Sequence, residues 1–206
     1  MSVRGCTVIG IEGTHASGKT TLVHALVAHY RERGVHVDGT GEPARTSPFI
    51  EEIVIHGRGS FDLVTEIDLF AAQLTALLRT ARYHTMLIAD KTIANVLAYA
   101  RVVLCAPPGS HNAAVLDAMA AFCRAWAHVY DAVFFCADQY GQQPPGDGFR
   151  DKVLHLQHDV AQAVRATCAD AGLPLVDVPT GLTVDERVHW VTGRIADLGI
   201  APDPVA

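Results

Sequence analysis

The sequence predicts an α/β protein of three layers, in which a five-stranded, mostly parallel sheet lies between helices. Two observations support this prediction. Short apolar runs alternate with longer amphipathic stretches along the chain, and this alternation is typical of strands joined by crossover helices. A glycine-bounded loop also joins the first apolar run to the first amphipathic stretch. The 206 residues suffice for one domain with a real core.

The hydrophobic pattern gives the expected position of each element in order. Strands are expected at residues 7–11, 35–38, 86–90, 132–137 and 173–178. Helices are expected at residues 19–33, 61–83, 93–104, 112–128, 151–171 and 185–198. We expect residues 1–200 to form a single domain, with a lid segment at about residues 138–157 and a loose tail at residues 201–206.

Composition excludes several classes of protein. The net charge of −6 argues against a nucleic-acid-binding protein, which would normally carry a basic face. Five cysteines without a C-x-x-C pair indicate free thiols in a reducing compartment. With no signal peptide and no apolar stretch near 18 residues, we expect a soluble cytoplasmic protein without a membrane partner.

The glycine-bounded loop reads G-x-x-x-x-G-K-T, the P-loop pattern that binds the phosphates of a nucleoside triphosphate. A strand before it and a helix after it create a nest of backbone N–H groups with a dipole that favours anions. Lys19 can reach the β- and γ-phosphates, and the Thr20 hydroxyl can hold Mg²⁺. The expected cofactors are therefore ATP and Mg²⁺. The expected nucleotide-binding residues are Gly13, Thr14, His15, Ala16, Ser17, Gly18, Lys19, Thr20 and Thr21.

Two carboxylates follow expected strands and compete for the metal. Asp90 ends the run at 86–90, and Asp138 follows the run at 132–137. An Asp at the end of a strand beside the P-loop strand usually holds Mg²⁺ or its water. Lys91 and Thr92 add a cation and a hydroxyl at the same strand end, so we favour Thr20 and Asp90 as the metal ligands.

A third carboxylate, Glu42, follows the second expected strand in the sequence Gly-Glu-Pro-Ala-Arg. A carboxylate opposite a P-loop can accept the proton of an attacking hydroxyl or orient the acceptor. Arg45 can bind a phosphate or carboxylate of that acceptor. Either Glu42 or Asp90 can be the base, and the sequence leaves this choice open.

The expected lid is rich in glycine and proline and carries Arg150. Lids of this kind exclude water from a reaction centre. Arg150 precedes the residues of an expected helix, where its charge opposes the helix dipole. We therefore expect Arg150 to act on the transferring phosphoryl group, with Lys19, Glu42 and Asp90 as the other catalytic residues.

The order of these motifs resembles known families. The P-loop, Glu42-Pro43, Asp90-Lys91-Thr92 and Ala98-Tyr99 resemble the thymidylate-kinase and deoxynucleoside-kinase branch of P-loop kinases. Residues 130–135, 147–151 and 185–188, with the Glu-x-x-Arg element at Glu42, are more similar to the nicotinamide-riboside-kinase-like family. Those kinases commonly have Arg at the position of Lys91, and Lys lacks the planar fork of Arg.

The resemblance implies a P-loop NTPase fold with the P-loop strand central and a helical lid. It also implies transfer of the ATP γ-phosphate to a small acceptor, often a nucleoside or nucleotide. The loop containing Thr180 and Gly181 would lie near the adenine. The acceptor would contact Glu42, Arg45, Lys91 and Tyr99.

The sequence leaves three functions open. A small-molecule kinase is favoured by the Glu42 loop and the expected lid, since a kinase needs an acceptor pocket and must exclude water. A regulatory or switch-type P-loop ATPase without a small acceptor is the alternative, and Asp138 begins a D-x-x-G sequence of the GTPase kind. A nucleic-acid end kinase is disfavoured by the acidic balance. The expected partners are thus ATP and a small acceptor, with a homodimer among the expected arrangements.

Overall fold

The computed structural model describes residues 3, 5–14, 16–140 and 157–200. These residues form a five-stranded sheet in the order β2-β3-β1-β4-β5, in which every neighbouring pair is parallel. Its strands are β1 (Thr7–Gly13), β2 (Val37–Thr40), β3 (Met86–Asp90), β4 (Ala132–Cys136) and β5 (Leu175–Val178). The strand that leads into the P-loop, β1, lies at the centre of the sheet, as expected.

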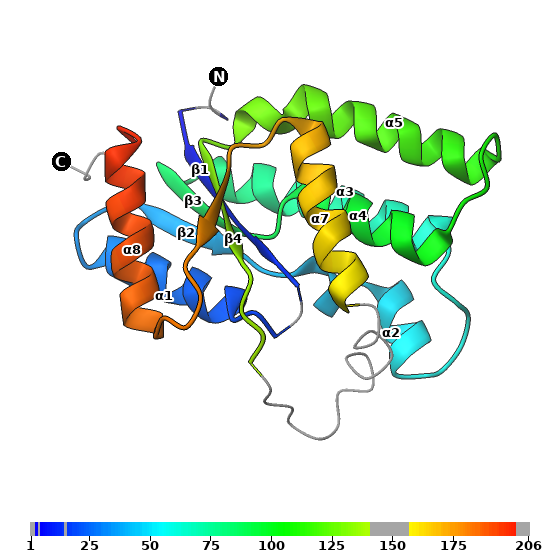
Figure 1. Ribbon diagram of the computed structural model, residues 1–206, viewed down its shortest axis with the longest axis horizontal. Coiled ribbons are helices and arrows are strands. Elements are labelled where there is room, and N and C mark those ends of the chain that lie inside the picture. The colour runs from blue at the N-terminus through cyan, green and yellow to red at the C-terminus, as the bar shows by residue number, and fades with distance from the viewer. Residues whose placement is uncertain (1–2, 4, 15, 141–156, 201–206) are drawn as a thin grey trace.

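Helices cover both faces of the sheet (Figure 1). One face packs against α3 (Leu63–Ala81), α4 (Ile93–Leu104), α5 (His111–Trp126) and α7 (Gln157–Ala171). The other face packs against α1 (Lys19–Arg31) and α8 (Val184–Asp197). Alternate residues of each strand enter the two cores, so Val8 packs in the first and Ile9 in the second. This confirms the predicted three-layer α/β class.

The boundaries differ from the sequence-based expectations in places. The second strand lies at Val37–Thr40, two residues later than expected, because the segment before it turns at Gly34 and Val35. The short helix α2 (Pro48–Val54) was not predicted; Ser47 caps it and Pro48 occupies its first turn. Short 3-10 helices also occur at Pro43–Arg45 and Ala127–Val129.

The start of α8 is fixed by the local sequence. Thr183 accepts a hydrogen bond from the backbone N–H of Glu186, and the Glu186 carboxylate accepts one from the backbone N–H of Thr183. This reciprocal pair satisfies two N–H groups that the first turn leaves unpaired. The helix start therefore falls one residue before the predicted position.

Two composition-based expectations bear on the described part of the chain. The five cysteines are free thiols, with Cys105 exposed and the other four buried. None of the helices in the described residues combines the length and the apolar character needed to cross a membrane.

Candidate functional site

The P-loop joins β1 to α1 and requires glycine at two positions. Gly13 has φ = 140°, and a Cβ atom there would lie 2.5 Å from the Cys136 carbonyl oxygen. Gly18 has φ = 77° and would place a Cβ 3.0 Å from the Tyr140 ring. Both backbone conformations favour glycine. No acidic residue occupies the first turn of α1, so the helix dipole there favours an anion.

The Lys19 ammonium group is buried against the P-loop itself. It donates to the Thr14 carbonyl oxygen and lies 3.3 Å from the Ser17 hydroxyl. Burial lowers the pKa of Lys19 to about 8, and the nearby Lys91 charge contributes to this lowering. The ammonium group is thus held at the loop where a phosphate would compensate its charge.

Thr20 and Asp90 come together at the carboxyl end of the sheet. The Thr20 hydroxyl donates to Asp90 Oδ2 at 2.7 Å. The second oxygen, Asp90 Oδ1, is buried and has no hydrogen-bond partner among the described residues. A hydroxyl and a free carboxylate oxygen suit Mg²⁺, which takes few protein ligands and completes its shell with phosphate and water. In the described residues no group of three or more His, Cys, Asp or Glu could hold a metal.

The rival carboxylate, Asp138, faces a different partner. It forms an ion pair with Arg187, and its Oδ1 accepts a 2.9 Å hydrogen bond from the Gly181 backbone N–H. These contacts engage both Asp138 oxygens away from Thr20. The structure thus places Asp90, rather than Asp138, beside the P-loop hydroxyl.

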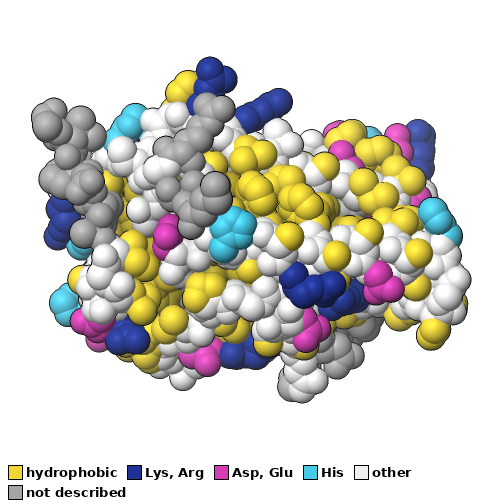
Figure 2. Space-filling view, turned by 90° about the horizontal axis from the view of Figure 1, so that it is seen from above, with side chains coloured by type: hydrophobic (Ala, Val, Ile, Leu, Met, Phe, Trp, Pro, Cys, Tyr) yellow, Lys and Arg dark blue, Asp and Glu magenta, His cyan; other side chains and the backbone are white. Residues whose placement is uncertain are grey.

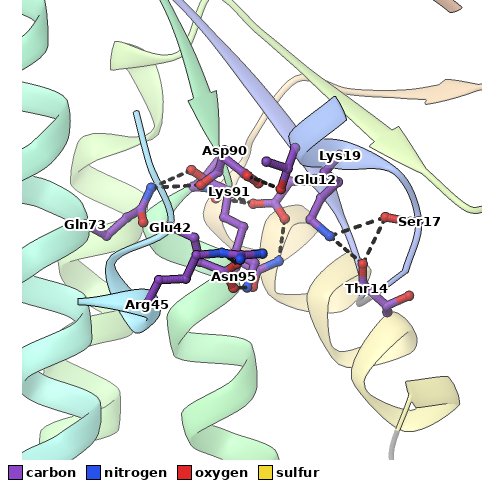
Figure 3. Close-up of polar contacts among 12 residues, drawn as sticks. Glu12, Thr14, Ser17, Lys19, Glu42, Arg45, Gln73, Asp90, Lys91 and Asn95 are labelled. Carbon is purple, nitrogen blue, oxygen red and sulfur yellow. Dashed lines mark hydrogen bonds and ion pairs between the residues drawn. The ribbon is translucent and has the colours of Figure 1, made fainter. Parts of the chain in front are cut away.

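Glu42, Lys91 and Arg45 form a charged cluster opposite the P-loop (Figure 3). Lys91 Nζ lies 2.6 Å from Glu42 Oε1, and Arg45 Nε lies 3.2 Å from Glu42 Oε2. Burial opposes the Lys91 charge, but the Glu42 carboxylate outweighs it and raises the pKa of Lys91. Lys91 Nζ also lies 5.3 Å from the centre of the Tyr99 ring, within cation–π range. The four predicted acceptor-binding residues are therefore neighbours.

The turn that carries Lys91 is strained and is held from β1. Lys91 has φ = 74°, a left-handed conformation that is unfavourable for residues with a side chain. Its backbone N–H donates to the Ile11 carbonyl oxygen at 3.1 Å. Gln73 of α3 donates to the carbonyl oxygens of Asp90 and Lys91 at 3.2 and 2.8 Å. Neighbouring elements thus fix this conformation.

Glu12, fully buried at the end of β1, binds the next part of the same turn. Its Oε1 accepts from the Thr92 backbone N–H at 2.8 Å and from the Thr92 hydroxyl at 2.6 Å. Its Oε2 accepts from the Asn95 amide at 2.5 Å (Figure 3). Burial raises the pKa of Glu12, while these hydrogen bonds and Lys19 lower it. Glu12 therefore connects the P-loop strand to the turn that presents Asp90 and Lys91.

Arg187 of α8 supports the P-loop from a distant part of the chain. Its side chain is 2% exposed, donates to the Ser17 carbonyl oxygen at 3.0 Å and pairs with Asp138. Its guanidinium carbon lies 5.0 Å from the centre of the Tyr140 ring. The Tyr140 backbone N–H donates to the Ala16 carbonyl oxygen at 2.9 Å. Three segments that are far apart in the sequence thus meet at this loop.

A cleft of about 390 Å³ connects the two sides of the site. On one side it is lined by the P-loop and the start of α1, and on the other by the charged cluster. Tyr140, Val184 and Arg187 close one end. The lining residues that the sequence predicted are Ala16, Ser17, Gly18, Lys19, Thr20, Thr21, Glu42, Arg45 and Lys91.

Some predicted residues lie outside this cleft or outside the described residues. Thr180 and Gly181 do not line it in the described structure, although Gly181 binds Asp138. Asp90 lines an adjoining cleft of about 540 Å³ that shares Thr20, Glu42 and Arg45 with the first. Tyr99 contacts Lys91. His15, Arg150 and most of the predicted lid, residues 141–156, lie outside the described residues.

Comparisons with known proteins place the chain in a family. Residues 8–187 match the AAA domain family, which is most of the sequence. The chain therefore belongs to that family of P-loop proteins. A search of curated proteins found no match.

Solved structures agree with this assignment at the level of the fold. Thymidylate kinase from Candida albicans is similar with a TM-score of 0.69 and 19% identity, covering 95% of this chain and 93% of that one. A NadR protein in complex with NAD and AMP-PNP is similar with a TM-score of 0.64 and 15% identity. This chain is 99% covered and spans 52% of that NadR chain, about half its length. The P-loop kinase resemblance is thus confirmed as a shared fold.

Sequence reasoning did not identify three residues as part of the site. Glu12 had a usable signal, because a charged residue interrupts an otherwise apolar strand directly before the P-loop. Gln73 gave none, since a Gln within a helical pattern is ordinary. Arg187 lies 170 residues from Ser17, and no local pattern reports a contact over that distance.

Proposed function

We propose that this protein transfers the γ-phosphoryl group of Mg-ATP to a hydroxyl of a small acceptor, a nucleoside, nucleotide or related metabolite. One observation carries the proposal. The P-loop and the cluster of Glu42, Lys91 and Arg45 line the same cleft, so a phosphate donor and a polar acceptor would meet between them. Positioning and charge stabilisation supply most of the catalysis in phosphoryl transfer.

The donor would bind at the start of α1. The loop amides and Lys19 would hold the phosphates, and Thr20 with Asp90 would hold Mg²⁺. The metal would neutralise charge on the β- and γ-phosphates when bound. The hydrogen bond between the Thr20 hydroxyl and Asp90 Oδ2 holds these two oxygens 2.7 Å apart, where both could contact the metal.

The acceptor would bind beside Glu42. Its hydroxyl oxygen forms the new bond to the γ-phosphorus while the bond to the β–γ bridging oxygen breaks and ADP leaves. The hydroxyl proton goes to a carboxylate, and Glu42 is the better candidate because it lines the cleft on the acceptor side, whereas Thr20 and the metal would engage the two Asp90 oxygens. Lys91 and Arg45 would hold Glu42 in place and attract a negatively charged acceptor.

The structural neighbours support phosphoryl transfer to nucleotides or nucleosides in general. One is a thymidylate kinase, and a NadR protein was solved in complex with AMP-PNP and another in complex with NR. The cluster of Glu42, Lys91 and Arg45 favours a kinase over a switch-type ATPase, because a switch does not need residues on the acceptor side.

A transfer assay tests the proposal directly. ATP labelled in the γ-phosphate is incubated with the protein, Mg²⁺ and a panel of nucleosides and nucleoside monophosphates, and both labelled products and free phosphate are measured. We expect label on at least one acceptor, and no turnover with Lys19→Ala. Release of phosphate to water alone, across the panel, would overturn the kinase assignment in favour of the ATPase.

A further inference from the structure

Arg187 is buried at a position that protein stability alone does not explain. On the face of the molecule seen in Figure 2, Lys and Arg side chains project from the surface. Among the arginines that the structure describes, Arg187 alone is buried, with 2% of its surface exposed. Its Nε–H has no hydrogen-bond partner among the described residues. Since a buried ion pair with an unsatisfied donor adds little net stability, a second role for this side chain is indicated.

The P-loop binds an anion through backbone N–H groups, whose directions depend on the peptide planes. Ala16 and Gly18 have φ values of 58° and 77°, so left-handed residues alternate with Ser17 along the loop. In such a nest, successive N–H groups converge on the concave side and the carbonyl groups between them point outward. A trans peptide holds its C=O and its N–H on opposite sides. A donor that binds an outward carbonyl oxygen therefore directs the following N–H toward the anion.

Two donors bind consecutive carbonyl groups on the outside of the loop. The Tyr140 backbone N–H donates to the Ala16 carbonyl oxygen at 2.9 Å, which orients the Ser17 N–H. Arg187 Nη1 donates to the Ser17 carbonyl oxygen at 3.0 Å, which orients the Gly18 N–H. Ala16 is left-handed although it has a side chain, and the Tyr140 contact helps to hold this unfavourable conformation.

The Arg187 guanidinium is itself held in a fixed direction. Asp138 pairs with its Nη2 and accepts a 2.9 Å hydrogen bond from the Gly181 backbone N–H. The capping box at Thr183 fixes the start of α8 about one turn before Arg187. One terminal nitrogen thus faces Asp138 and the other faces the loop, and the planar fork of arginine holds both directions at once.

The contacts of Arg187 separate orientation from a direct effect of its charge. The Asp138 carboxylate compensates the positive charge, so the pair is neutral as a whole. Both terminal nitrogens are engaged, one by Asp138 and one by the Ser17 carbonyl oxygen. The guanidinium would therefore act on a bound anion through the peptide between Ser17 and Gly18.

We propose that Arg187 is a positioning residue for the triphosphate: it binds the outward carbonyl oxygen of Ser17 and so directs the Gly18 N–H at the phosphates. This inference rests on the proposed function only in placing a triphosphate at the P-loop, and it requires no acceptor. Because the contact acts on the phosphates, loss of Arg187 should weaken every triphosphate ligand to the same degree, whatever its base.

Calorimetric titration with ATP, GTP and inorganic tripolyphosphate tests the proposal. The variant combines Arg187→Met with Asp138→Asn, so that no lone charge stays buried. We expect the affinity for all three ligands to fall by about 10- to 100-fold, the scale of one hydrogen bond to a charged group. If the affinity for tripolyphosphate stays unchanged while those for ATP and GTP fall, Arg187 acts on the base beside Tyr140, and the proposal is overturned.

A second Arg–Asp pair provides the matched control. Arg165 and Asp177 lie 2.6 Å apart and connect α7 to β5. Arg165→Met with Asp177→Asn removes an ion pair of the same kind without a contact to the loop, so the affinity for tripolyphosphate should stay unchanged. An equal loss in this control would overturn the proposal, because the effect would then come from any lost Arg–Asp pair.

Lys19→Ala separates this inference from the proposed function. We expect it to abolish binding of all three ligands. Binding that disappears with Lys19→Ala but is unaffected by the double change at Arg187 and Asp138 overturns this inference and leaves the proposed function standing. Binding that survives Lys19→Ala places the triphosphate away from the P-loop and overturns both.

Two further measurements distinguish positioning from a loss of stability. Arg187→Lys keeps the charge and a donor but not the planar fork, so its affinity for each ligand should lie between those of the wild type and the double variant. It also carries the test if the double variant does not fold. In amide NMR spectra of protein with isotope-labelled glycine, tripolyphosphate should shift the Gly18 signal strongly in the wild type and less in either variant. An unchanged Gly18 shift in a folded variant would overturn the proposal.

Discussion

Thr20 and Asp90 are joined by a 2.7 Å hydrogen bond from the hydroxyl to Oδ2, across 70 residues of sequence. This bond connects the first turn of α1 to the end of β3. It leaves Asp90 Oδ1 buried without a partner in the described structure. Because an unpaired buried carboxylate oxygen is costly, its presence here favours a cation as the missing partner.

Asp90→Asn should abolish the effect of Mg²⁺ on ATP binding. We expect Mg²⁺ to strengthen binding in the wild type and to have about a tenth of that effect or less in the variant, since the amide is a weaker ligand for a hard cation. Calorimetric titration of ATP with and without Mg²⁺ measures this. Asp138→Asn is the matched control, and a larger loss there would shift the metal assignment to Asp138.

Binding of ATP should weaken as the pH rises above about 8. The pKa of Lys19 is lowered to about 8 before ligand binds, so the ammonium is charged below this pH and neutral above it. A bound phosphate favours the charged form and raises the pKa, which means that binding takes up a proton near pH 8–9. Calorimetry at pH 8.5 detects this proton uptake, because the observed binding enthalpy then differs between two buffers of different ionisation enthalpy. Lys19→Ala should remove both the uptake and most of the affinity.

Glu42→Gln should reduce turnover while leaving ATP affinity largely unchanged. The change removes the proton acceptor and weakens the contacts to Lys91 and Arg45, none of which belongs to the P-loop. A loss of about 10²–10³ in kcat is the scale for a positioned base. Single-turnover transfer measures the rate of the chemical step, and ATP titration measures the affinity for ATP. Unchanged transfer to the acceptor would show that Glu42 is not the base.

Glu12→Ala should destabilise the fold by about 2–4 kcal/mol, because it leaves both Thr92 donors and the Asn95 amide buried without their acceptor. Glu12→Gln should cost much less. The Gln oxygen can still accept from Thr92, and Asn95 can rotate to offer its Oδ1, which has no partner among the described residues. Urea unfolding measures the free energy of unfolding of both variants. An equal loss of stability in Glu12→Ala and Glu12→Gln would contradict the prediction.

Glu66→Gln should stabilise the protein at pH 8 but not at pH 5. Burial raises the pKa of Glu66 to about 7, with a smaller contribution from the charge of Asp62. Since the folded-state pKa exceeds the value of 4.5 for a free side chain, ionisation costs stability progressively between pH 4.5 and 7. The difference between these two pKa values corresponds to an upper limit of roughly 3 kcal/mol. Melting curves at both pH values test this, with Glu52→Gln on the exposed face of α2 as control.

The fold was predictable from the sequence because each βα unit carries its own signal. The run ending in Asp90 is apolar enough to be a buried strand, and the P-loop marks the junction between the first strand and the first helix. The short helix at Pro48–Val54 was missed because seven residues contain too little periodicity to detect.

The site was predictable only where chemistry and sequence position coincide. Thr20, Glu42 and Asp90 lie at strand or helix ends, and the topology of a parallel sheet brings those ends to one edge. Strand order alone could not decide which of Asp90 and Asp138 would meet Thr20, since β3 and β4 both border β1. The choice follows from the packing of α1, which contacts β2 and β3 and so brings Thr20 to the end of β3. The contacts of Gln73 and Arg187 arise from packing of helices, which no local pattern encodes.

Arg187 holds a loop whose residues are synthesised much earlier than α8. The loop carbonyl that it binds belongs to Ser17, 170 residues earlier. During translation the P-loop is therefore synthesised long before Arg187, the residue that supports it. A nascent chain halted before α8 would present the motif without the guanidinium that binds the Ser17 carbonyl oxygen.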